Sequence, residues 1–146
     1  MIKKFNFVDA SAKFHKDNKD SGLPLGTQLY HVGSLLGESG ANSMTTGIMS
    51  QVGRMLALNS STKVVFDQTT VTAFPGSSGG GVFLTNGEYI GMLVRGAGET
   101  FNLIVPIRRI NKWAKSENIL WALDPNVDAP SLEEIHKLPK EKIGKL

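Results

Sequence analysis

Short apolar, β-prone segments separated by turn residues begin at residue 28 and continue to residue 107. Asn86-Gly87 lies between two of these apolar runs, and an Asn-Gly pair in that setting is the strongest short-range signal for a β-hairpin. Counting the hairpin as two strands gives about six strands, at the spacing typical of an antiparallel sandwich or barrel. The expected strand segments are 28–36, 44–58, 61–71, 81–96 (the hairpin) and 100–107.

Two glycines, Gly47 and Gly53, lie inside the second strand segment. Glycine within a strand often marks a bulge or a bend, so this strand is expected to be bent or bulged at glycine. Residues 37–43, which are rich in Gly, Ser and Asn, are expected to form the loop that precedes it.

The period of the apolar residues changes from two to about 3.6 after Pro106, which predicts one amphipathic helix packed against the strands. Its expected apolar face consists of Ile107, Ile110, Trp113 and Ala114, and the basic residues lie elsewhere: Arg108, Arg109, Lys112 and Lys115. Prolines and lysines then predict an extended tail, in which Trp121 and Leu123 are candidates for docking. The expected division is an N-terminal segment (1–22), a β-barrel (23–106), a C-terminal helix (107–118) and a tail (119–146).

Length and composition fit one compact domain, because the chain has 146 residues of which 40% are hydrophobic. The absence of cysteine excludes disulfides, zinc-thiolate sites and a cysteine nucleophile, and no cofactor or metal is expected. The net charge is +3, but basic residues are scattered and not interleaved with aromatics, which argues against nucleic-acid binding. No apolar run suits a signal peptide or a membrane span, so a cytoplasmic or virion-associated protein without membrane contact is expected.

The segment AFPGSSGGGVF, residues 73–83, places two serines among glycines between apolar flanks. By composition alone, such a stretch favours a flexible linker. The alternative is a sharp turn that presents a serine nucleophile. The order of the surrounding segments distinguishes the two.

PGSSGGGVF resembles the nucleophile turn of chymotrypsin-like serine proteases, especially the bacterial and viral trypsin-like and HtrA-type branches with P-G-x-S-G-G. The segments LPLGTQLYHVG, MTTGIMSQVGR, VVFDQTTVTAFPGSSGG, NGEYIGMLVRG and VPIRRINKWA are similar to successive parts of that fold, in the family's order, over residues 23–115. The resemblance implies a mainly β fold: a six-stranded antiparallel Greek-key barrel, the C-terminal half of a chymotrypsin-like double barrel, with a C-terminal helix. A glycine-rich hairpin connection without chemistry remains the alternative for the turn.

The resemblance makes Ser78 the nucleophile and assigns the oxyanion-binding N–H groups to Gly76 and Ser78. A hydroxyl that attacks a peptide carbonyl creates an oxyanion, which needs preorganised donors close by. Glycine at positions 79 and 80 would allow backbone and substrate to approach closely. Ser77 stands where animal members have the aspartate that binds a new N-terminus, so zymogen activation of that kind is not expected.

A serine hydroxyl needs a base that is oriented by a third group. In FVDASAKF, Asp9 resembles the family's orienting acid just before the link to the second barrel, although it could equally be a solvated acid at a strand end. The family's histidine lies upstream of this acid, in the first barrel. His15, His31 and His136 do not match that position, and His31 is expected to be a core or edge residue.

Three explanations for the unmatched histidine stay open. The chain could be the C-terminal piece of a protease whose first barrel is separate or removed, an internal start or maturation product, or a relic retained for binding. Half of a double barrel leaves an exposed apolar face, so association with a first-barrel chain or with itself is expected. The corresponding functions are a serine endopeptidase that cleaves polypeptides through an acyl-enzyme on Ser78, and an inactive structural or interaction module, for instance of a virus particle.

The resemblance also implies the residues that form the pocket for the substrate residue before the cut: Thr72, Ala73, Val94, Arg95, Gly96 and Asn102. Trypsin-like members that bind Lys or Arg keep a carboxylate at the pocket floor, and no carboxylate stands there in this sequence. A small, polar or apolar substrate residue is therefore expected. Arg95 either favours an acidic residue further along the substrate or is a solvated strand arginine.

Overall fold

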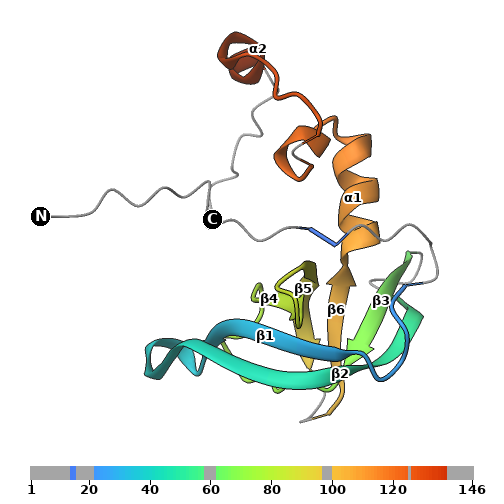
Figure 1. Cartoon of the computed structure of the whole chain (residues 1–146), viewed down its shortest axis with the longest axis vertical. Helices are drawn as coiled ribbons and strands as arrows, with labels where there is room; N and C mark the ends of the chain where they lie inside the picture. Colours follow the sequence, from blue (N-terminus) through green and yellow to red (C-terminus); the bar gives the residue numbers. More distant parts are fainter. Residues whose placement is uncertain (1–13, 16–21, 58–61, 97–99, 125, 138–146) are drawn as a thin grey trace, which may run out of the picture.

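Six antiparallel strands close into a barrel, and a helix follows the last strand (Figure 1). The computed structural model describes residues 14–15, 22–57, 62–96, 100–124 and 126–137. Around the barrel the strands lie in the order β1-β2-β3-β6-β5-β4, which confirms the predicted fold class. The strands are β1 (Gln28–Leu35), β2 (Gly40–Ala57), β3 (Lys63–Thr69), β4 (Gly81–Leu84), β5 (Tyr89–Gly96) and β6 (Asn102–Pro106).

The strand order places the glycine-serine segment at one end of the barrel. β3 lies between β2 and β6, whereas the next strand along the chain, β4, lies between β1 and β5. Residues 70–80 must therefore cross from one side of the barrel to the other. They arrive beside the end of β1, because Val32 of β1 pairs with Gly81 of β4.

Buried and exposed side chains alternate along the strands, and the buried ones form the core. On β1, Leu29 and His31 are fully buried, whereas Val32 is exposed. Removal of apolar side chains from water contributes roughly 1.5–3 kcal/mol for each fully buried Val, Leu, Ile or Met. The barrel core consists of Leu29, Met49, Val71, Val82, Ile90, Leu93 and Ile104.

The glycines of β2 have different roles. Pairing with β3 shifts register between Met49 and Arg54, and Gly53 has φ +74°, so the predicted bulge occurs there. Gly47 instead pairs regularly with Leu29, and a side chain at Gly47 would overlap the backbone of Val71. β2 also begins within the expected loop 37–43, because Gly40 already pairs with Leu35 of β1. Only a short 3-10 turn, η1 (Gly37–Ser39), separates the two strands.

Helix α1 (Ile107–Ser116) continues directly from β6 and stands on the barrel end by its first turn (Figure 1). Ile107 and Ala114 are buried as predicted, but Trp113 is 54% exposed, so its assignment to the packed face was wrong. Ala114, one residue further along the helix, is fully buried, so the packed face of α1 includes Ala114 and leaves Trp113 outside it. The 3-10 turn η2 (Leu120–Ala122) follows α1, and Trp121 and Leu123 are half-buried.

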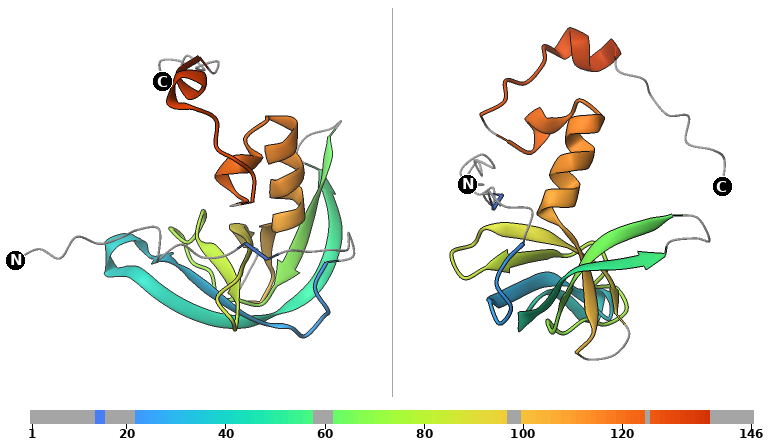
Figure 2. Two further views of the ribbon diagram at one scale, coloured as in Figure 1. Left: turned by 45° about the horizontal axis from the view of Figure 1, so that its top comes forward. Right: turned by 90° about the vertical axis from the view of Figure 1, so that its right-hand side faces the viewer.

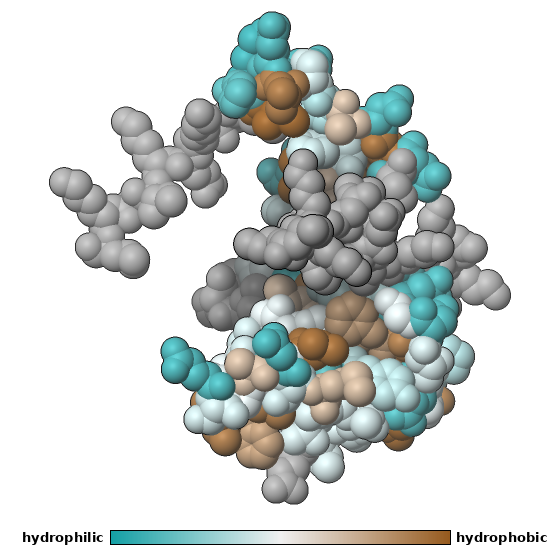
Figure 3. Space-filling model, turned by 60° about the vertical axis from the view of Figure 1, so that its left-hand side comes forward, coloured by the Kyte–Doolittle hydropathy of each residue, from teal (hydrophilic) through white to brown (hydrophobic). Residues whose placement is uncertain are grey.

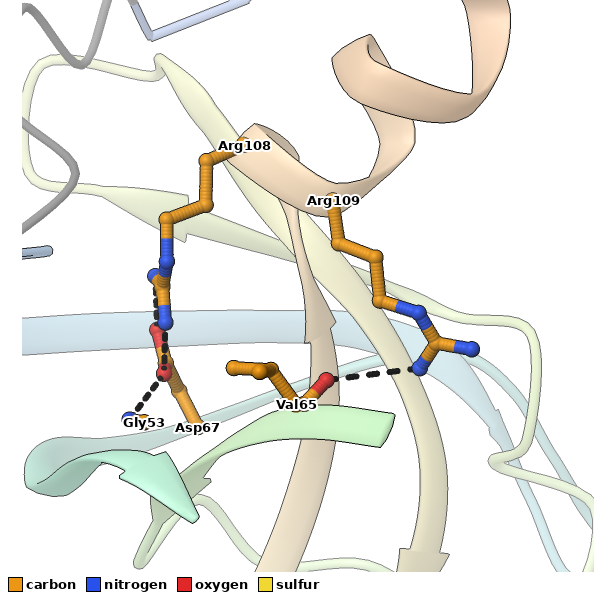
Figure 4. Close-up of polar contacts among 5 residues, drawn as sticks. All are labelled: Gly53, Val65, Asp67, Arg108 and Arg109. Atoms are coloured by element: carbon orange, nitrogen blue, oxygen red, sulfur yellow. Dashed lines mark hydrogen bonds and ion pairs between the residues drawn. The ribbon is translucent and has the colours of Figure 1, made fainter. Parts of the chain in front are cut away.

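Arg108, predicted on the polar face of the helix, instead reaches down to the barrel (Figure 4). Its Nη1 and Nη2 donate to Oδ2 and Oδ1 of Asp67 on β3, at 2.6 and 2.5 Å. The N–H of Gly53 donates to the same Oδ1 at 2.9 Å. One carboxylate therefore ties the helix, β3 and the β2 bulge together.

The last described helix, α2 (Leu132–Lys137), lies apart from the barrel in both views of Figure 2. It begins with a capping interaction in which Ser131 Oγ accepts from the N–H of Glu134. Over the residues that the structure describes, no helix has both the length and the apolar character needed to cross a membrane.

Candidate active site

Hydrogen bonds fix the glycine-serine segment as a packed turn. The N–H of Ser77 donates to the Phe74 carbonyl at 2.9 Å, and the N–H of Phe74 donates back to Ser77 Oγ at 3.0 Å. The N–H of Gly79 donates to the Leu93 carbonyl at 2.7 Å, and that of Gly80 to the Ser77 carbonyl at 3.0 Å. Ser77 is 1% exposed, so its hydroxyl is a structural part of the turn.

Two N–H groups in the middle of this turn are exceptions. The N–H groups of Gly76 and Ser78 donate no hydrogen bond to any residue in the described part of the chain, whereas those of Ser77 and Gly79 do. Gly76 has φ +96°, a conformation that favours glycine. The turn thus leaves two backbone N–H groups, two residues apart in the sequence, without a partner among the described residues.

Ser78 itself is exposed beside a pocket. Its Oγ donates to the Val94 carbonyl on β5 over 3.4 Å, a long bond that holds the hydroxyl only weakly. The pocket has a volume of about 490 Å³ and lies between the turn and the end of β5. It is lined by Ala73, Phe74, Pro75, Ser77, Ser78, Leu93, Val94, Arg95 and Gly96.

Four of the six residues expected for the substrate pocket line it: Ala73, Val94, Arg95 and Gly96. The other two lie behind its wall. The Thr72 carbonyl accepts a hydrogen bond from Thr45 Oγ1 at 3.0 Å. Asn102 is fully buried and donates from Nδ2 to the Val71 carbonyl at 2.7 Å, and a side chain at Gly96 would overlap its amide.

The pocket lining also includes Phe74, Pro75 and Leu93, which the sequence did not suggest. Phe74 and Pro75 lie in the segment AFPGSSGGGVF, just before the two serines. This position next to Ser77 and Ser78 could have identified them as pocket residues. Among the described residues that line the pocket, Arg95 alone is charged, and it is exposed. Across the described residues, no group of three or more His, Cys, Asp or Glu could hold a metal ion.

No histidine in the described segments hydrogen-bonds Ser78 Oγ. His15 Nδ1 lies 2.6 Å from Glu88 Oε2, and the His15 N–H donates to the Tyr89 carbonyl at 2.9 Å. His136 is exposed on α2. Asp9, the candidate orienting acid, lies outside the described residues.

His31 is buried behind the turn, as expected for a core residue. Its Nδ1 lies 3.5 Å from Thr45 Oγ1, and a Cβ added to Gly33 would come within 2.8 Å of its Nε2. Burial lowers the pKa of His31, because the cation is poorly solvated there, and the nearby Ser77 backbone opposes this shift in part. The neutral imidazole is therefore the form that packs against the turn.

The buried His31 is expected to make the barrel sensitive to acid. A histidine whose pKa is lowered by folding binds more protons when unfolded, so its contribution to stability is complete above about pH 6.5 and declines as the pH falls below it. Urea unfolding at pH 8 and pH 5 should show a smaller decline for His31→Gln than for the wild type, by at most about 1.4 kcal/mol per pH unit. His136→Gln, at an exposed site, should decline like the wild type. Equal declines in wild type and His31→Gln would contradict this expectation.

Solved structures with the same fold include proteases. The HtrA-type protease AlgW, solved with a decapeptide, has a TM-score of 0.60 and 22% identity, covering 73% of this chain and 32% of that chain. The MamO protease domain from Magnetospirillum magneticum, in its apo form, has a TM-score of 0.53 and 18% identity, covering 64% and 51%. Deg5 has a TM-score of 0.53 and 22% identity, covering 69% and 45%. At these identities the likeness is one of fold, and the chain spans about half or less of each solved chain.

Among curated protein sequences, none matches the chain. The trypsin-like peptidase domain family, in contrast, matches residues 9–92, which is more than half of the chain and includes the whole turn from Ala73 to Gly81. The family expected from the sequence is thereby confirmed. The chain, with its closed barrel and its serine turn, belongs to the trypsin-like peptidase domain family.

Proposed function

We propose that this chain is the nucleophile-bearing half of a serine endopeptidase, in which Ser78 Oγ attacks a peptide carbonyl and forms an acyl-enzyme. The N–H groups of Gly76 and Ser78 would stabilise the oxyanion. The observation that carries the proposal is that the N–H groups of Gly76 and Ser78 donate to no described residue, whereas those of Ser77, Gly79 and Gly80 in the same turn are bonded. Gly76 and Ser78 are both exposed, so their N–H groups are open to solvent and to a bound oxyanion.

The proposed base is a histidine from a first barrel, carried either on another part of the same polypeptide or on a separate one. Asp9 is the proposed acid that orients it. The substrate is a polypeptide, with a small or apolar residue in the pocket, because the described lining is mainly apolar and includes no carboxylate. The first barrel, or a second copy of the chain, would cover exposed apolar side chains, including Val32, Met44 and Phe74. In Figure 3, apolar side chains form separate areas on the visible face of the barrel, among more polar ones.

A non-catalytic interaction module is the second candidate. It is favoured by one observation: in the part of the chain that the structure describes, Ser78 Oγ contacts a carbonyl and not a histidine. On this alternative, the turn would serve only to close the barrel end.

Labelling with a fluorophosphonate probe separates the two functions. The full chain is incubated with the probe with and without imidazole, which can act as an external base, and the modified residue is identified by peptide mapping. Labelling at Ser78 should exceed labelling at Ser39, an exposed serine in η1, and should increase with imidazole. The oxyanion donors act on Ser78 alone, which is the reason for this selectivity.

Ser78→Ala is the control for the assignment, and it should retain the barrel while losing the selective label. If Ser78 and Ser39 react equally slowly with imidazole present, the endopeptidase proposal fails and the interaction module is favoured.

A further inference from the structure

The connection between β1 and β2 touches the serine turn through a single main-chain hydrogen bond. We call residues 34–39 the β1–β2 tip. Within it, the N–H of Leu36 donates to the Pro75 carbonyl at 2.9 Å. Pro75 immediately precedes Gly76, whose N–H is one of the two unengaged donors.

Leu36 adopts a backbone conformation that disfavours its own residue type. Its φ and ψ are 59° and 35°, in the left-handed region, which costs of order 1–3 kcal/mol for a residue with a side chain. Its side chain is 61% exposed, so burial of the side chain does not account for this conformation. In this conformation the N–H of Leu36 donates to the Pro75 carbonyl of the serine turn.

Peptide geometry converts this contact into an orientation of the Gly76 N–H. In a planar trans peptide, the carbonyl and the N–H point in opposite directions. Because the Pro75 carbonyl points to the tip, the Gly76 N–H points away from the tip. A rotated Pro75–Gly76 peptide would break the bond to Leu36 and aim a carbonyl oxygen where the N–H now points.

Close packing against the β1–β2 tip also restricts the same peptide. A Cβ added to Gly76 would lie 2.8 Å from the Ser34 carbonyl oxygen and 3.0 Å from the Gly37 nitrogen. Both atoms belong to the β1–β2 tip. The tip therefore both binds the carbonyl and bounds the space in which Gly76 can move.

From these contacts we infer that Leu36 is a positioning residue, whose backbone N–H holds the Pro75–Gly76 peptide in the orientation that presents the Gly76 N–H to an oxyanion. The inference deepens the proposed function of the serine turn and rests on it for its catalytic meaning.

The test removes the backbone N–H donor of Leu36 and keeps the leucine side chain. The amide that joins Leu35 to Leu36 is replaced in the full chain by an ester, with the 2-hydroxy analogue of leucine at position 36. Residual dipolar couplings should then show a changed orientation of the Gly76 N–H relative to the barrel, and the rate of fluorophosphonate labelling at Ser78 should fall at least tenfold.

The matched control is an ester at Gly87, whose N–H makes a comparable turn hydrogen bond, 2.9 Å to the Leu84 carbonyl, between β4 and β5. This ester should leave both readouts as in the wild type. An unchanged Gly76 N–H in the Leu36 ester would overturn the inference.

A measurement on the unmodified chain does not depend on folding of the ester. A scalar coupling across the hydrogen bond, between the Leu36 nitrogen and the Pro75 carbonyl carbon, should be detectable, and its absence in the folded chain would also overturn the inference. The two proposals can fail separately. If Ser78 is not labelled selectively in the wild type, the endopeptidase proposal fails, while the dipolar couplings still decide whether Leu36 orients the peptide.

Discussion

Replacing Gly76 with alanine is expected to slow fluorophosphonate labelling of Ser78 by about 100- to 1,000-fold, the usual cost of losing one oxyanion donor. Gly76 has φ +96°, and its added Cβ would lie 2.8 Å from the Ser34 carbonyl oxygen. Backbone atoms on the opposing side cannot yield as a flexible side chain would. The peptide must therefore move, and the N–H moves with it.

The control for Gly76→Ala is Gly87→Ala, in the turn between β4 and β5. Gly87 also has a positive φ, +80°, but an added Cβ meets nothing within 4 Å. It should lose roughly 1–2 kcal/mol of stability from backbone strain and label like the wild type. If Gly76→Ala also labels like the wild type while remaining folded, the Gly76 N–H does not contribute to the oxyanion site.

The fold was predictable because the relevant signals are local. Alternation along the strands, the Asn86-Gly87 turn and the change of period after Pro106 each depend on residues close in sequence. The exposure of Trp113 was not predictable in this way. Periodicity assigns both Trp113 and Ala114 to the apolar face, but the position of β5, β6 and η2 around α1 determines that Ala114 is covered and Trp113 is not.

The site was predictable only as far as a contiguous motif describes it. The motif nominated Ser78 and Gly76, and the order of the segments nominated the walls of the pocket. Two of those wall residues, Thr72 and Asn102, lie one layer behind the lining, because whether a residue near a pocket faces it depends on the pairing of distant strands. The hydrogen bond from Leu36 to Pro75 spans 39 residues and is made by main-chain atoms, so no side-chain type signals it.

The ion pair between Asp67 and Arg108 was also missed, since 41 residues separate its members. In the sequence, nothing distinguishes Asp67 from any other acidic residue in a predicted strand. Arg108 is likewise one of several basic residues in the predicted helix. In the structure, the Asp67 side chain is 3% exposed and the Arg108 side chain 15%. The neighbouring Arg109 makes weaker contacts: its guanidinium lies 5.0 Å from the centroid of the Phe66 ring and donates to the Val65 carbonyl at 3.3 Å (Figure 4).

Arg108→Met is expected to reduce the free energy of unfolding by about 3–5 kcal/mol, because it leaves the Asp67 carboxylate buried without its counter-charge. Adding Asp67→Asn to this variant should recover part of the loss. The amide removes the uncompensated charge and keeps an oxygen for the N–H of Gly53. Urea unfolding of the wild type, both single variants and the double variant measures this recovery.

The prediction is thus that a second substitution, destabilising by itself, stabilises the Arg108→Met background. Arg109→Met supplies the matched control from the adjacent position of α1, and its loss should stay near 1 kcal/mol or below, as for a partly exposed cation over an aromatic ring. A double variant no more stable than Arg108→Met would mean that water reaches the Asp67 carboxylate once the arginine is gone. In that case the attachment of α1 to the barrel would depend on the apolar contacts of Ile107 instead of on the ion pair.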